Sequence, residues 1–512
     1  MQSTKKSPLK ERNVIYKRNY KLRVALVYPN RYQVASSCLA PRIIYDLLNQ
    51  LNGVYCERFV HPESETIPPS SIESGTPLGK FQYILGTIQF ELDYVNLCRM
   101  LEISRIPFLR EEREKHDSLH ILVIGGPVPT ANPWLASAIA DAVFLGEIEP
   151  TYERLIGSFQ ENSREAVLQA LSEVPGLWIP AKNHFPTKIV RTTQFHTPLA
   201  QVIPDKGPKA QKGTFADHFL MELSRGCSRG CLFCLIGHTK RPARFAQVSD
   251  IVETVSKGIP TTGAKKVSFI GSSAADHPDL YDILQTLNLR KVPFVLPSLR
   301  IDSDSRIIEE IVKTGQRTIT IAPESHIEEE RFSLGKQFTN ASIFDYANSV
   351  RKAKIRELRA YFISGIPETP FLSRLPLEIW IKEMNDFVVE LRKRFASSKI
   401  RFSLTPFVPK PYTKLQQSVP DFNRMKREQD ACIPVFKKAG IRFSLGSIRW
   451  APVQTYLSMA GEGAAEIIRR VYLKGGLLNA WKKTVGNFVQ LLETESERWN
   501  ERFSPRYTTE WL

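Results

Sequence analysis

The sequence has little cysteine and no long apolar run. Seven cysteines occur in 512 residues, too few for the disulfide framework of a small secreted protein. No stretch of about twenty apolar residues is present, so we expect no membrane span. The N-terminus is polar and basic and lacks the apolar centre of a signal peptide. We therefore expect a cytoplasmic protein with reduced thiols.

Acidic residues are also scarce, since 53 Asp and Glu stand against 70 Lys and Arg, a formal net charge of +17. Such an excess permits an anionic partner. However, no aromatic-interleaved RNA-binding motif or helix-turn-helix pattern accompanies the charge. Solubility is the simpler interpretation, and nucleic acid the less favoured one. Part of the charge lies in residues 1–20, which we expect to be a flexible basic tail.

Three of the seven cysteines lie together. Cys227, Cys231 and Cys234 have the spacing C-x-x-x-C-x-x-C and follow an apolar run at 218–223 that predicts a strand. Three thiolates on a short loop can bind three irons of a cubane iron–sulfur cluster and leave the fourth iron without a protein ligand. In catalytic metal sites, an open coordination position is where a substrate or cofactor binds.

Other interpretations of these cysteines are weaker. A zinc ribbon would need a second C-x-x-C pair. The remaining cysteines are instead scattered singly, at Cys38, Cys56, Cys98 and Cys432. Buried thiols can also cluster by chance, since free cysteine often serves as a small apolar residue. Phe233 directly before the third cysteine, and glycines at 226 and 230 that let the backbone bend around a cluster, favour the iron–sulfur hypothesis.

This loop, with its aromatic residue and its glycines, resembles the cysteine loop of the radical SAM superfamily. The resemblance implies a [4Fe-4S] cluster on Cys227, Cys231 and Cys234, whose open iron is chelated by the amino and carboxylate groups of S-adenosylmethionine (SAM). An electron from the cluster would cleave SAM to a 5′-deoxyadenosyl radical. The resemblance also implies an electron donor such as ferredoxin or flavodoxin.

Between residues 21 and 158, short apolar runs alternate with helical patterns. The strand-like runs lie at 23–28, 54–60, 83–88, 121–124 and 142–145. Continuous apolar strands that alternate with helices predict an α/β fold with a parallel, doubly wound sheet. Such sheets bind ligands beyond the carboxyl ends of their strands. Gly125, Gly126, Gly146 and Glu147 follow two of these strands and are candidate cofactor-binding residues.

This N-terminal region resembles the cobalamin-binding domain that precedes the barrel in one large class of radical SAM proteins. The resemblance implies cobalamin as a third cofactor. The sequence departs from the best-known cobalamin pattern, because residues 28–37 stand where a D-x-H-x-x-G motif would follow the first strand. Either cobalamin binds without a histidine axial ligand, or the domain keeps only the fold.

Residues 159–213 are proline-rich, then polar and basic, and predict a bridging segment. From 214 to 450 the alternation resumes, with strand-like runs after the cysteine strand at 267–271, 294–297, 318–323, 360–365 and 401–407. These six β–α units match the partial barrel of a radical SAM core, in which functional residues collect at the carboxyl ends of strands. Residues 451–512 predict helices that cap the barrel, with Val471, Leu473, Leu477 and Leu478 in their core.

Polar and glycine residues stand at the ends of the predicted barrel strands. Gly271, Ser272 and Ser273 occupy the place of the family's Gly-Gly-Glu turn, which binds the methionyl amino group, but the acidic third position is missing. Ser298 and Arg300 end the third strand. Their hydroxyl and guanidinium are candidates to bind the ribose and the methionyl carboxylate of SAM.

Two further strand ends and one later segment complete the pattern. Glu324 places a carboxylate at the end of the fourth strand, and Gly365 begins a turn that resembles the family's adenine-flanking turn. Phe233 is a further candidate cofactor contact. Residues 405–413 resemble the P-F-x-P-K-P-x-T segment of methylthiotransferase-like cores and of an uncharacterised group with an N-terminal cobalamin-like domain.

These features favour a radical SAM enzyme that performs cobalamin-assisted methylation of an unactivated carbon. The alternatives are methylthiotransferase-like RNA base modification and an iron–sulfur scaffold or regulator without turnover. A small-molecule or lipid-like substrate is favoured over RNA. The N-terminal domain would cover the barrel opening, which could then admit a base only if that base were extruded from its stack.

Overall fold

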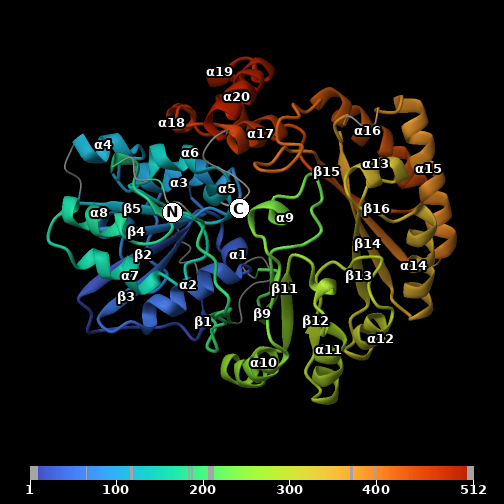
Figure 1. Ribbon diagram of the computed structural model, residues 1–512, viewed down its shortest axis with the longest axis horizontal. Coiled ribbons are helices and arrows are strands. Elements are labelled where there is room, and N and C mark those ends of the chain that lie inside the picture. The colour runs from blue at the N-terminus through green and yellow to red at the C-terminus, as the bar shows by residue number, and fades with distance from the viewer. Residues whose placement is uncertain are drawn as a thin grey trace, which may run out of the picture.

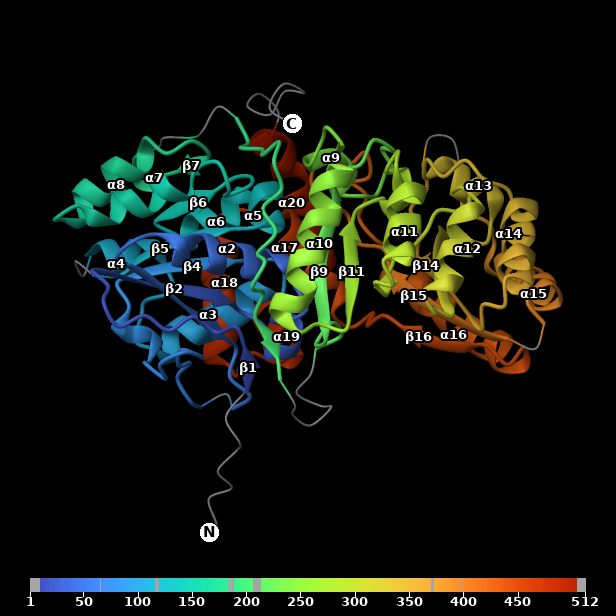
Figure 2. The same ribbon diagram turned by 90° about the horizontal axis from the view of Figure 1, so that it is seen from below.

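The computed structural model describes residues 10–64, 66–115, 119–182, 185, 188–205, 213–369, 373–396 and 398–503. Residues 1–9 of the expected tail and residues 206–212 of the bridging segment lie outside this range. Two α/β units lie side by side, and the C-terminal helices lie against the first unit (Figures 1 and 2). Among the described residues, no helix combines the length and the apolar character that a membrane crossing requires.

The N-terminal unit contains a six-stranded sheet in the order β3-β2-β4-β5-β6-β7. Its strands are β2 (Leu22–Tyr28), β3 (Val54–Val60), β4 (Tyr83–Thr87), β5 (Ile121–Gly125), β6 (Ala142–Phe144) and β7 (Leu177–Trp178). The first five are parallel, and β7 is antiparallel to β6. The predicted doubly wound sheet is therefore confirmed. The strand order reverses between β2 and β4, and such a switch point is where open α/β sheets bind ligands.

Helices cover both faces of this sheet. They are α1 (Tyr32–Ala35), α2 (Leu39–Gln50), η1 (Leu78–Lys80), α3 (Asp93–Ile103), α4 (Arg110–Lys115), α5 (Pro127–Ala131), α6 (Pro133–Ile139), α7 (Tyr152–Gly157), η2 (Ser158–Gln160), α8 (Arg164–Ser172) and η3 (Pro180–Lys182). Strand β2 contributes side chains to both covered faces. Val24 and Leu26 belong to the core under α2, α7 and α8. Ala25 and Val27 belong to the core under α3 and α6. A strand buried on both faces is apolar throughout.

Part of the expected flexible tail is ordered. Residues Glu11–Arg12 form β1, which pairs antiparallel with β8 (Ile203–Pro204) in the bridging segment. The carboxylate of Glu11 accepts hydrogen bonds from Arg58 at 2.6 Å and from the Tyr32 hydroxyl at 2.6 Å. The expectation of a flexible tail through residue 20 is therefore wrong for this stretch, because Glu11 supplies the counter-charge of a buried arginine.

The second unit is an open, barrel-like α/β layer built from two four-stranded sheets, β10-β9-β11-β12 and β13-β14-β15-β16. Its strands are β9 (His218–Arg225), β10 (Arg244–Phe245), β11 (Lys266–Gly271), β12 (Phe294–Val295), β13 (Thr318–Glu324), β14 (Glu357–Ser364), β15 (Lys399–Pro406) and β16 (Arg442–Leu445). The six predicted strands are all present, and β10 and β16 are additional.

The two sheets form one continuous layer around a shared core. Between β12 and β13, the backbone N–H of Leu299 donates to the carbonyl of Thr320 at 2.8 Å, and buried residues of both sheets belong to one apolar cluster. The covering elements are α9 (Ile236–Thr239), α10 (Val248–Thr262), η5 (Ala274–Asp276), α11 (Leu280–Leu289), α12 (Arg306–Lys313), α13 (Glu328–Ser333), α14 (Asn340–Lys352), α15 (Leu377–Arg394) and α16 (Phe422–Lys438).

The C-terminal helices pack on the N-terminal unit and not across the barrel as predicted. Helices α17 (Ala451–Met459), α18 (Ala464–Leu473), α19 (Leu478–Val485) and α20 (Phe488–Phe503) follow β16. Buried Ile468, Val471 and Trp481 share the core beneath α3 and α6. The C-terminal helices contact the barrel at its loop after β15, where the Ser458 hydroxyl of α17 donates to the Pro409 carbonyl at 2.8 Å.

The predicted core of this segment is half correct. Val471 is buried and Leu478 partly buried, but Leu473 and Leu477 are 68% and 65% exposed. Leu473 ends α18, and Leu477 follows Gly475 and a second glycine, both with positive φ. The turn therefore directs both leucines away from the face that α18 presents to α3.

Candidate functional site

The cysteine loop begins where β9 ends, and glycines allow its two sharp turns. Gly226 has φ +78°, and a Cβ there would lie 2.0 Å from the carbonyl oxygen of Lys240. Gly230 has φ +66°, and a Cβ there would lie 2.6 Å from the Arg241 guanidinium. Both positions combine a left-handed backbone with a close neighbour, so only glycine fits without strain.

The three cysteines of this loop carry free thiols. Cys231 is buried, and Cys227 and Cys234 are half-buried. Burial raises the pKa of Cys227 and of Cys231, and the nearby Cys234 raises both further. The thiols are thus near enough to repel one another as thiolates. Such a set is stabilised by metal coordination, which requires and favours the deprotonated form.

Across the part of the chain that the structure describes, no three His, Cys, Asp or Glu side chains are grouped to bind one metal ion. This finding concerns a single ion, whose ligands must converge on one point. Three cysteines that bind a cubane cluster each bind a different iron.

The cysteine loop rests on the carboxyl ends of the later barrel strands. The backbone N–H of Leu232 donates to the Leu334 carbonyl at 3.1 Å. Phe233 packs with buried Leu334, Ile366 and Phe407, which lie in or beside the loops after β13, β14 and β15. Phe233 thus anchors the loop by apolar burial.

Charged residues at the strand ends are paired with one another. Arg300 donates two hydrogen bonds to Asp302, at 2.8 and 2.7 Å. Glu324 accepts from Lys336 Nζ at 2.7 Å. Arg300 and Lys336 both lower the pKa of Cys231 against the effect of its burial. These strand ends therefore face the cysteine loop, although the guanidinium fork of Arg300 is already bound to a carboxylate.

The remaining predicted SAM contacts differ in their environment. Ser272 and Ser298 are exposed, and Ser273 hydrogen-bonds Asp276, which also accepts from Arg229 at 3.0 Å. Gly365 is buried, and its N–H donates to the Glu428 carboxylate at 2.6 Å. A Cβ at Gly365 would lie 2.2 Å from Met425 Cγ. Packing against α16 therefore explains this glycine without a ligand.

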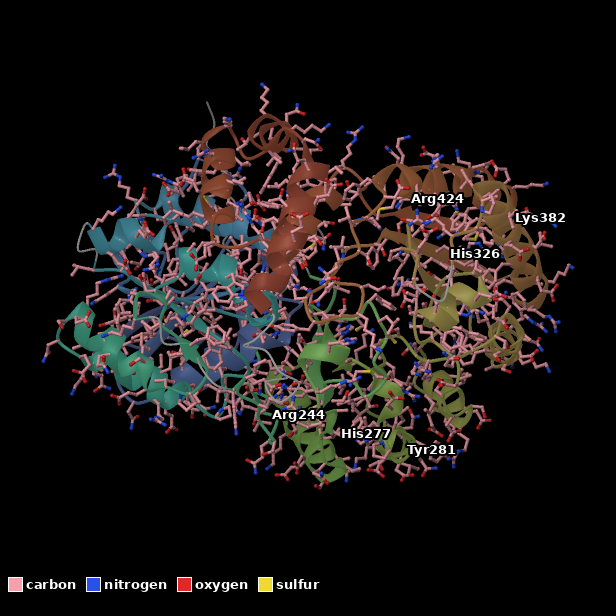
Figure 3. The ribbon with its side chains drawn as sticks, turned by 45° about the horizontal axis from the view of Figure 1, so that its top comes forward. Arg244, His277, Tyr281, His326, Lys382 and Arg424 are labelled. Carbon is pink, nitrogen blue, oxygen red and sulfur yellow. The ribbon has the colours of Figure 1, made fainter. Side chains whose placement is uncertain are left out.

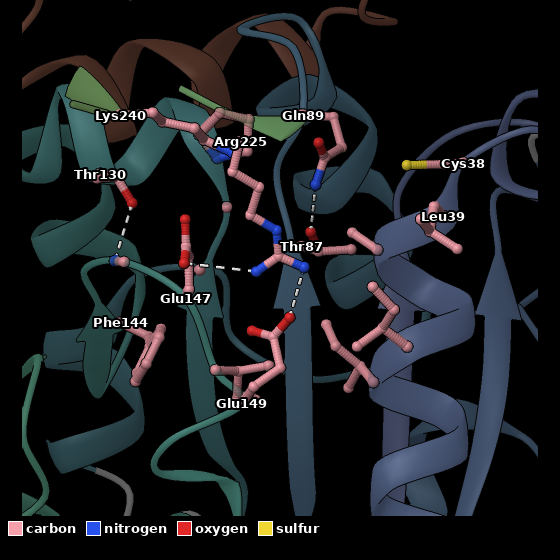
Figure 4. Close-up of a pocket in the computed structure, with 18 of the residues that line it drawn as sticks. Cys38, Leu39, Thr87, Gln89, Thr130, Phe144, Glu147, Glu149, Arg225 and Lys240 are labelled. Carbon is pink, nitrogen blue, oxygen red and sulfur yellow. Dashed lines mark hydrogen bonds and ion pairs between the residues drawn. The ribbon is translucent and has the colours of Figure 1, made fainter. Parts of the chain in front are cut away.

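A cavity of about 520 Å³ lies where the N-terminal strand ends meet the barrel. Gly125, Gly126, Gly146 and Glu147 line it from one side, and Gly271 lines it from the other. Figure 4 shows the polar side chains around it. The volume is in the usual range for small-molecule and cofactor sites. The cavity is thus lined by all four predicted cobalamin contacts, but by only one of the predicted SAM contacts, Gly271.

The glycines of this cavity have structural reasons as well. A Cβ on Gly126, at φ +115°, would lie 2.5 Å from the Ile88 carbonyl oxygen, and one on Gly146, at φ +125°, would lie 2.2 Å from that of Val190. The N–H of Gly146 donates to the Thr130 hydroxyl at 3.2 Å. These glycines allow close approach of neighbouring backbone, and their place on the cavity wall is a consequence of that packing.

An ion-pair network closes one wall of the cavity. Arg225, the last residue of β9, contacts Glu149 at 2.6 Å, Glu222 at 2.8 Å and Glu147 at 3.4 Å. Arg244 contacts Glu147 at 2.8 Å, and Figure 3 shows Arg244 at the border of the two units. Burial raises the pKa of Glu222. Against burial, Arg244 and Arg225 hold the pKa of Glu147 below its usual range.

Sequence reasoning missed Arg225, Glu149 and Glu222 as cavity residues. The available signal was a charged pair, Glu222 and Arg225, on the strand that leads into the cysteines. Lys336 was also missed, and it stands in a loop with no recognisable motif. No histidine is present among the described residues that line the cavity.

Two family models match the chain. The model of radical SAM proteins, N-terminal, matches residues 40–180, and the model of the radical SAM superfamily matches residues 221–371. The chain contains a radical SAM domain. That domain includes Cys227, Cys231 and Cys234 and the strand ends from β9 to β14.

Two curated relatives are similar in sequence to this chain. An uncharacterized protein of Methanocaldococcus jannaschii is 26% identical over 465 residues, which covers 90% of this chain and 94% of that protein. A tRNA-2-methylthio-N(6)-dimethylallyladenosine synthase of Staphylococcus haemolyticus is 26% identical over 162 residues, but this covers only 28% of this chain and 30% of the synthase.

Two solved structures are similar to the chain. The radical SAM methyltransferase TsrM of Kitasatospora setae, with cobalamin and a [4Fe-4S] cluster bound, has a TM-score of 0.50 and 14% identity, covering 78% of this chain and 74% of TsrM. The cobalamin-dependent radical SAM enzyme OxsB, with aqua-cobalamin bound, has a TM-score of 0.48 and 13% identity, covering 96% of this chain and 74% of OxsB. At 14% identity the likeness to TsrM shows the fold alone.

Proposed function

We propose that this radical SAM enzyme binds a [4Fe-4S] cluster through Cys227, Cys231 and Cys234 and cleaves SAM reductively. The observation that carries the proposal is the position of the cysteine loop, which rests on the carboxyl ends of the barrel strands next to the cavity. When bound, the cluster supplies the electron that splits SAM into methionine and a 5′-deoxyadenosyl radical. A fourth iron without a protein ligand is where SAM would be chelated.

The residues of the chain orient SAM and limit its contact with water. The backbone of Gly271 lies on the cavity wall, where its carbonyl would accept a hydrogen bond from the methionyl amino group. Arg300 binds Asp302, so a methionyl carboxylate there would exchange one carboxylate partner for another. The cavity wall is largely apolar, which strengthens such charged contacts by lowering the local dielectric.

We further propose that the cavity binds cobalamin and that the reaction is methylation of an unactivated carbon. The support is that the cavity lies at the switch-point edge of the N-terminal sheet and also touches the barrel at Gly271 and Arg225. A cofactor there would lie between the N-terminal strands and SAM. Cobalamin, when bound, supplies the methyl group. Because no described residue lining the cavity is a histidine, the cofactor would have no histidine ligand from this wall.

Anaerobic reconstitution with iron and sulfide tests the cluster. We expect a four-iron Mössbauer signature in the wild type and formation of 5′-deoxyadenosine from SAM with dithionite as reductant. The triple variant C227A/C231A/C234A should lose both. A wild-type protein without a four-iron cluster, or a triple variant that retains it, would overturn the proposal. Cluster binding without SAM cleavage would favour the scaffold alternative.

Cobalamin retention tests the second step. Cys38 lines the cavity from the N-terminal unit, so C38W should narrow it on that side and abolish cobalamin binding, while C38S keeps its volume and should retain the cofactor. Iron content and SAM cleavage should be unchanged in both variants. Purification with cobalamin supplied, followed by visible spectroscopy, gives the result. Equal cobalamin in C38W and C38S, or none in the wild type, would contradict the proposed cobalamin site.

RNA modification is a second candidate, favoured by the partial similarity to the tRNA methylthiotransferase and by the net charge of +17. If Lys and Arg contact phosphates, affinity for RNA must fall steeply with salt, on the order of a thousandfold between 50 and 200 mM for about six contacts. A titration with total cellular RNA at these two salt concentrations distinguishes an RNA substrate from a small-molecule substrate. Tight, salt-sensitive and selective binding would favour RNA over the small-molecule substrate.

A further inference from the structure

A buried lysine–glutamate pair lies against the cysteine loop. Lys336 is 9% exposed, and its ammonium donates to Glu324 Oε1 at 2.7 Å and to the Ala322 carbonyl at 2.6 Å. It also lies 5.9 Å from the centre of the Phe233 ring. The pair thus joins the end of β13 to the residues between Cys231 and Cys234.

The backbone on both sides keeps this pair in place. A Cβ on Gly335 would lie 3.5 Å from Cys231 Cα, so the residue before Lys336 touches the middle cysteine. Glu324 has φ +71°, a region that non-glycine residues adopt only where their surroundings hold them. The contact with Lys336 gives such a hold. The pair is therefore a fixed part of the loop's environment and not a surface ion pair.

Lys336 is the member of the pair that faces the cysteine loop. The ammonium of Lys336 lies over the ring of Phe233, directly before Cys234, at 5.9 Å from its centre, and Gly335 before it approaches Cys231. The ammonium is thus the charge of the pair that faces the cysteine loop. In a buried, low-dielectric site a cation at this position favours added negative charge on the thiolate and its iron.

We propose that the Lys336–Glu324 pair sets the reduction potential of the cluster, with Lys336 raising it and Glu324 limiting the rise. The proposal rests on the proposed cluster site. Reduction adds one electron, taken from a low-potential one-electron donor, and makes the cluster more negative by one unit. Lys336 stabilises that reduced form, so it determines how strong a reductant the enzyme requires. It acts as a tuning residue, and its carboxylate partner keeps the ammonium oriented.

A redox titration of the full-length, reconstituted protein, followed by EPR of the reduced cluster in the absence of SAM, tests the proposal. K336M should shift the midpoint to a more negative potential, lowering the reduced-to-oxidised ratio at fixed potential about tenfold, which is about 59 mV for one electron. E324Q should shift it in the opposite direction. K336R should stay near the wild type, and K336M/E324Q should lie between the single variants.

The control is K313M, which removes an exposed lysine from a lysine–glutamate pair away from the cysteine loop, because Lys313 Nζ lies 2.6 Å from Glu310 at the C-terminal end of α12. It should leave the potential unchanged. The proposal is overturned if K336M and E324Q leave the potential at the wild-type value or shift it in the same direction. If K336M binds no cluster, the direction of the E324Q shift decides. Failure of the wild type to bind a cluster would instead refute the proposed function.

Discussion

The carboxyl-terminal edges of the two parallel sheets differ in where their charges find partners. At the barrel edge the pairs are internal, since Arg300 binds Asp302 and Lys336 binds Glu324. At the N-terminal edge, Glu147 binds Arg225 and Arg244, which belong to the barrel unit. The strand ends after β12 and β13 therefore find their partners within the barrel, whereas the N-terminal edge shares its ion pairs with β9 and β10 of the barrel.

The N-terminal unit also depends on a later part of the chain for its apolar packing. There the apolar surface of α3 and α6 is covered by α18 and its neighbours, which come after the whole barrel in sequence. The N-terminal unit thus receives a charged wall from β9 and an apolar cover from the C-terminus. Cofactor binding at its edge would be coupled to the barrel through both contacts.

Removal of the C-terminal helices should have the largest effect. A chain ending at residue 450 would expose the apolar face formed by Leu97, Leu101 and Leu135, and we expect the N-terminal unit to lose protection while the barrel retains it. Hydrogen exchange with mass spectrometry measures each unit. A chain ending at residue 503 is the control. Loss of protection in the barrel alone would contradict the packing described above.

Loss of Arg225 should have the next largest effect. In R225M the largely buried carboxylates of Glu222 and Glu149, 15% and 10% exposed, lose their cation, which costs about 3–5 kcal/mol in the free energy of unfolding. Urea unfolding measures this cost, and hydrogen exchange should rise around residues 146–149. The control R306M breaks an exposed pair with Asp304 and should leave the free energy of unfolding nearly unchanged, because water and salt screen such a pair. Similar costs for the two variants would show that the N-terminal edge is independent of the barrel.

The pH dependence of stability should distinguish the two units through one carboxyl group in each. Burial raises the pKa of Asp93 to about 6 and that of Glu330 to about 7. Each of these carboxyl groups stays protonated in the folded protein at pH values where it is already ionised in the unfolded chain. Stability is therefore greatest below the ordinary pKa and falls as pH rises to about 6 for Asp93 or about 7 for Glu330.

The matching variants are D93N and E330Q. Each should remove about 2–3 kcal/mol of the decrease in the free energy of unfolding that accompanies rising pH. Urea unfolding of the cluster-free protein at several pH values between 4 and 8 gives the profiles. D93N should flatten the profile up to about pH 6, and E330Q up to about pH 7. Profiles unchanged from the wild type would mean that these carboxyl groups are ionised in the folded protein.

The smallest effect should come from the contact between Lys410 and Glu91, which joins the loop after β15 to the loop after β4. Glu91 also accepts from Gln454 of α17 at 3.1 Å. A double-mutant cycle with K410M and E91Q should give a coupling of about 1 kcal/mol. Additive effects of the two substitutions would show that this contact does not hold the units together.

Local patterns predicted the sheets and the cysteine loop because their signals are contiguous. The apolar run before Cys227 and the glycines of the loop lie within a dozen residues. The wall around Arg225 could not be predicted in this way, since its carboxylates come from residues 147, 149 and 222. The helical pattern of α18 predicts an apolar face but not which unit that face covers. The position of Lys336 beside the cysteine loop could not be predicted either, because the two segments are brought together only by the fold.

We propose that the cysteine loop and the N-terminal cavity form one composite site. EPR of the protein carrying both the reduced cluster and cob(II)alamin tests this proposal, because both centres then hold an unpaired electron. We predict signals that are split or broadened by mutual spin coupling in the wild type, and an uncoupled cluster signal in C38W. Two independent, unbroadened signals in the wild type would contradict the claim.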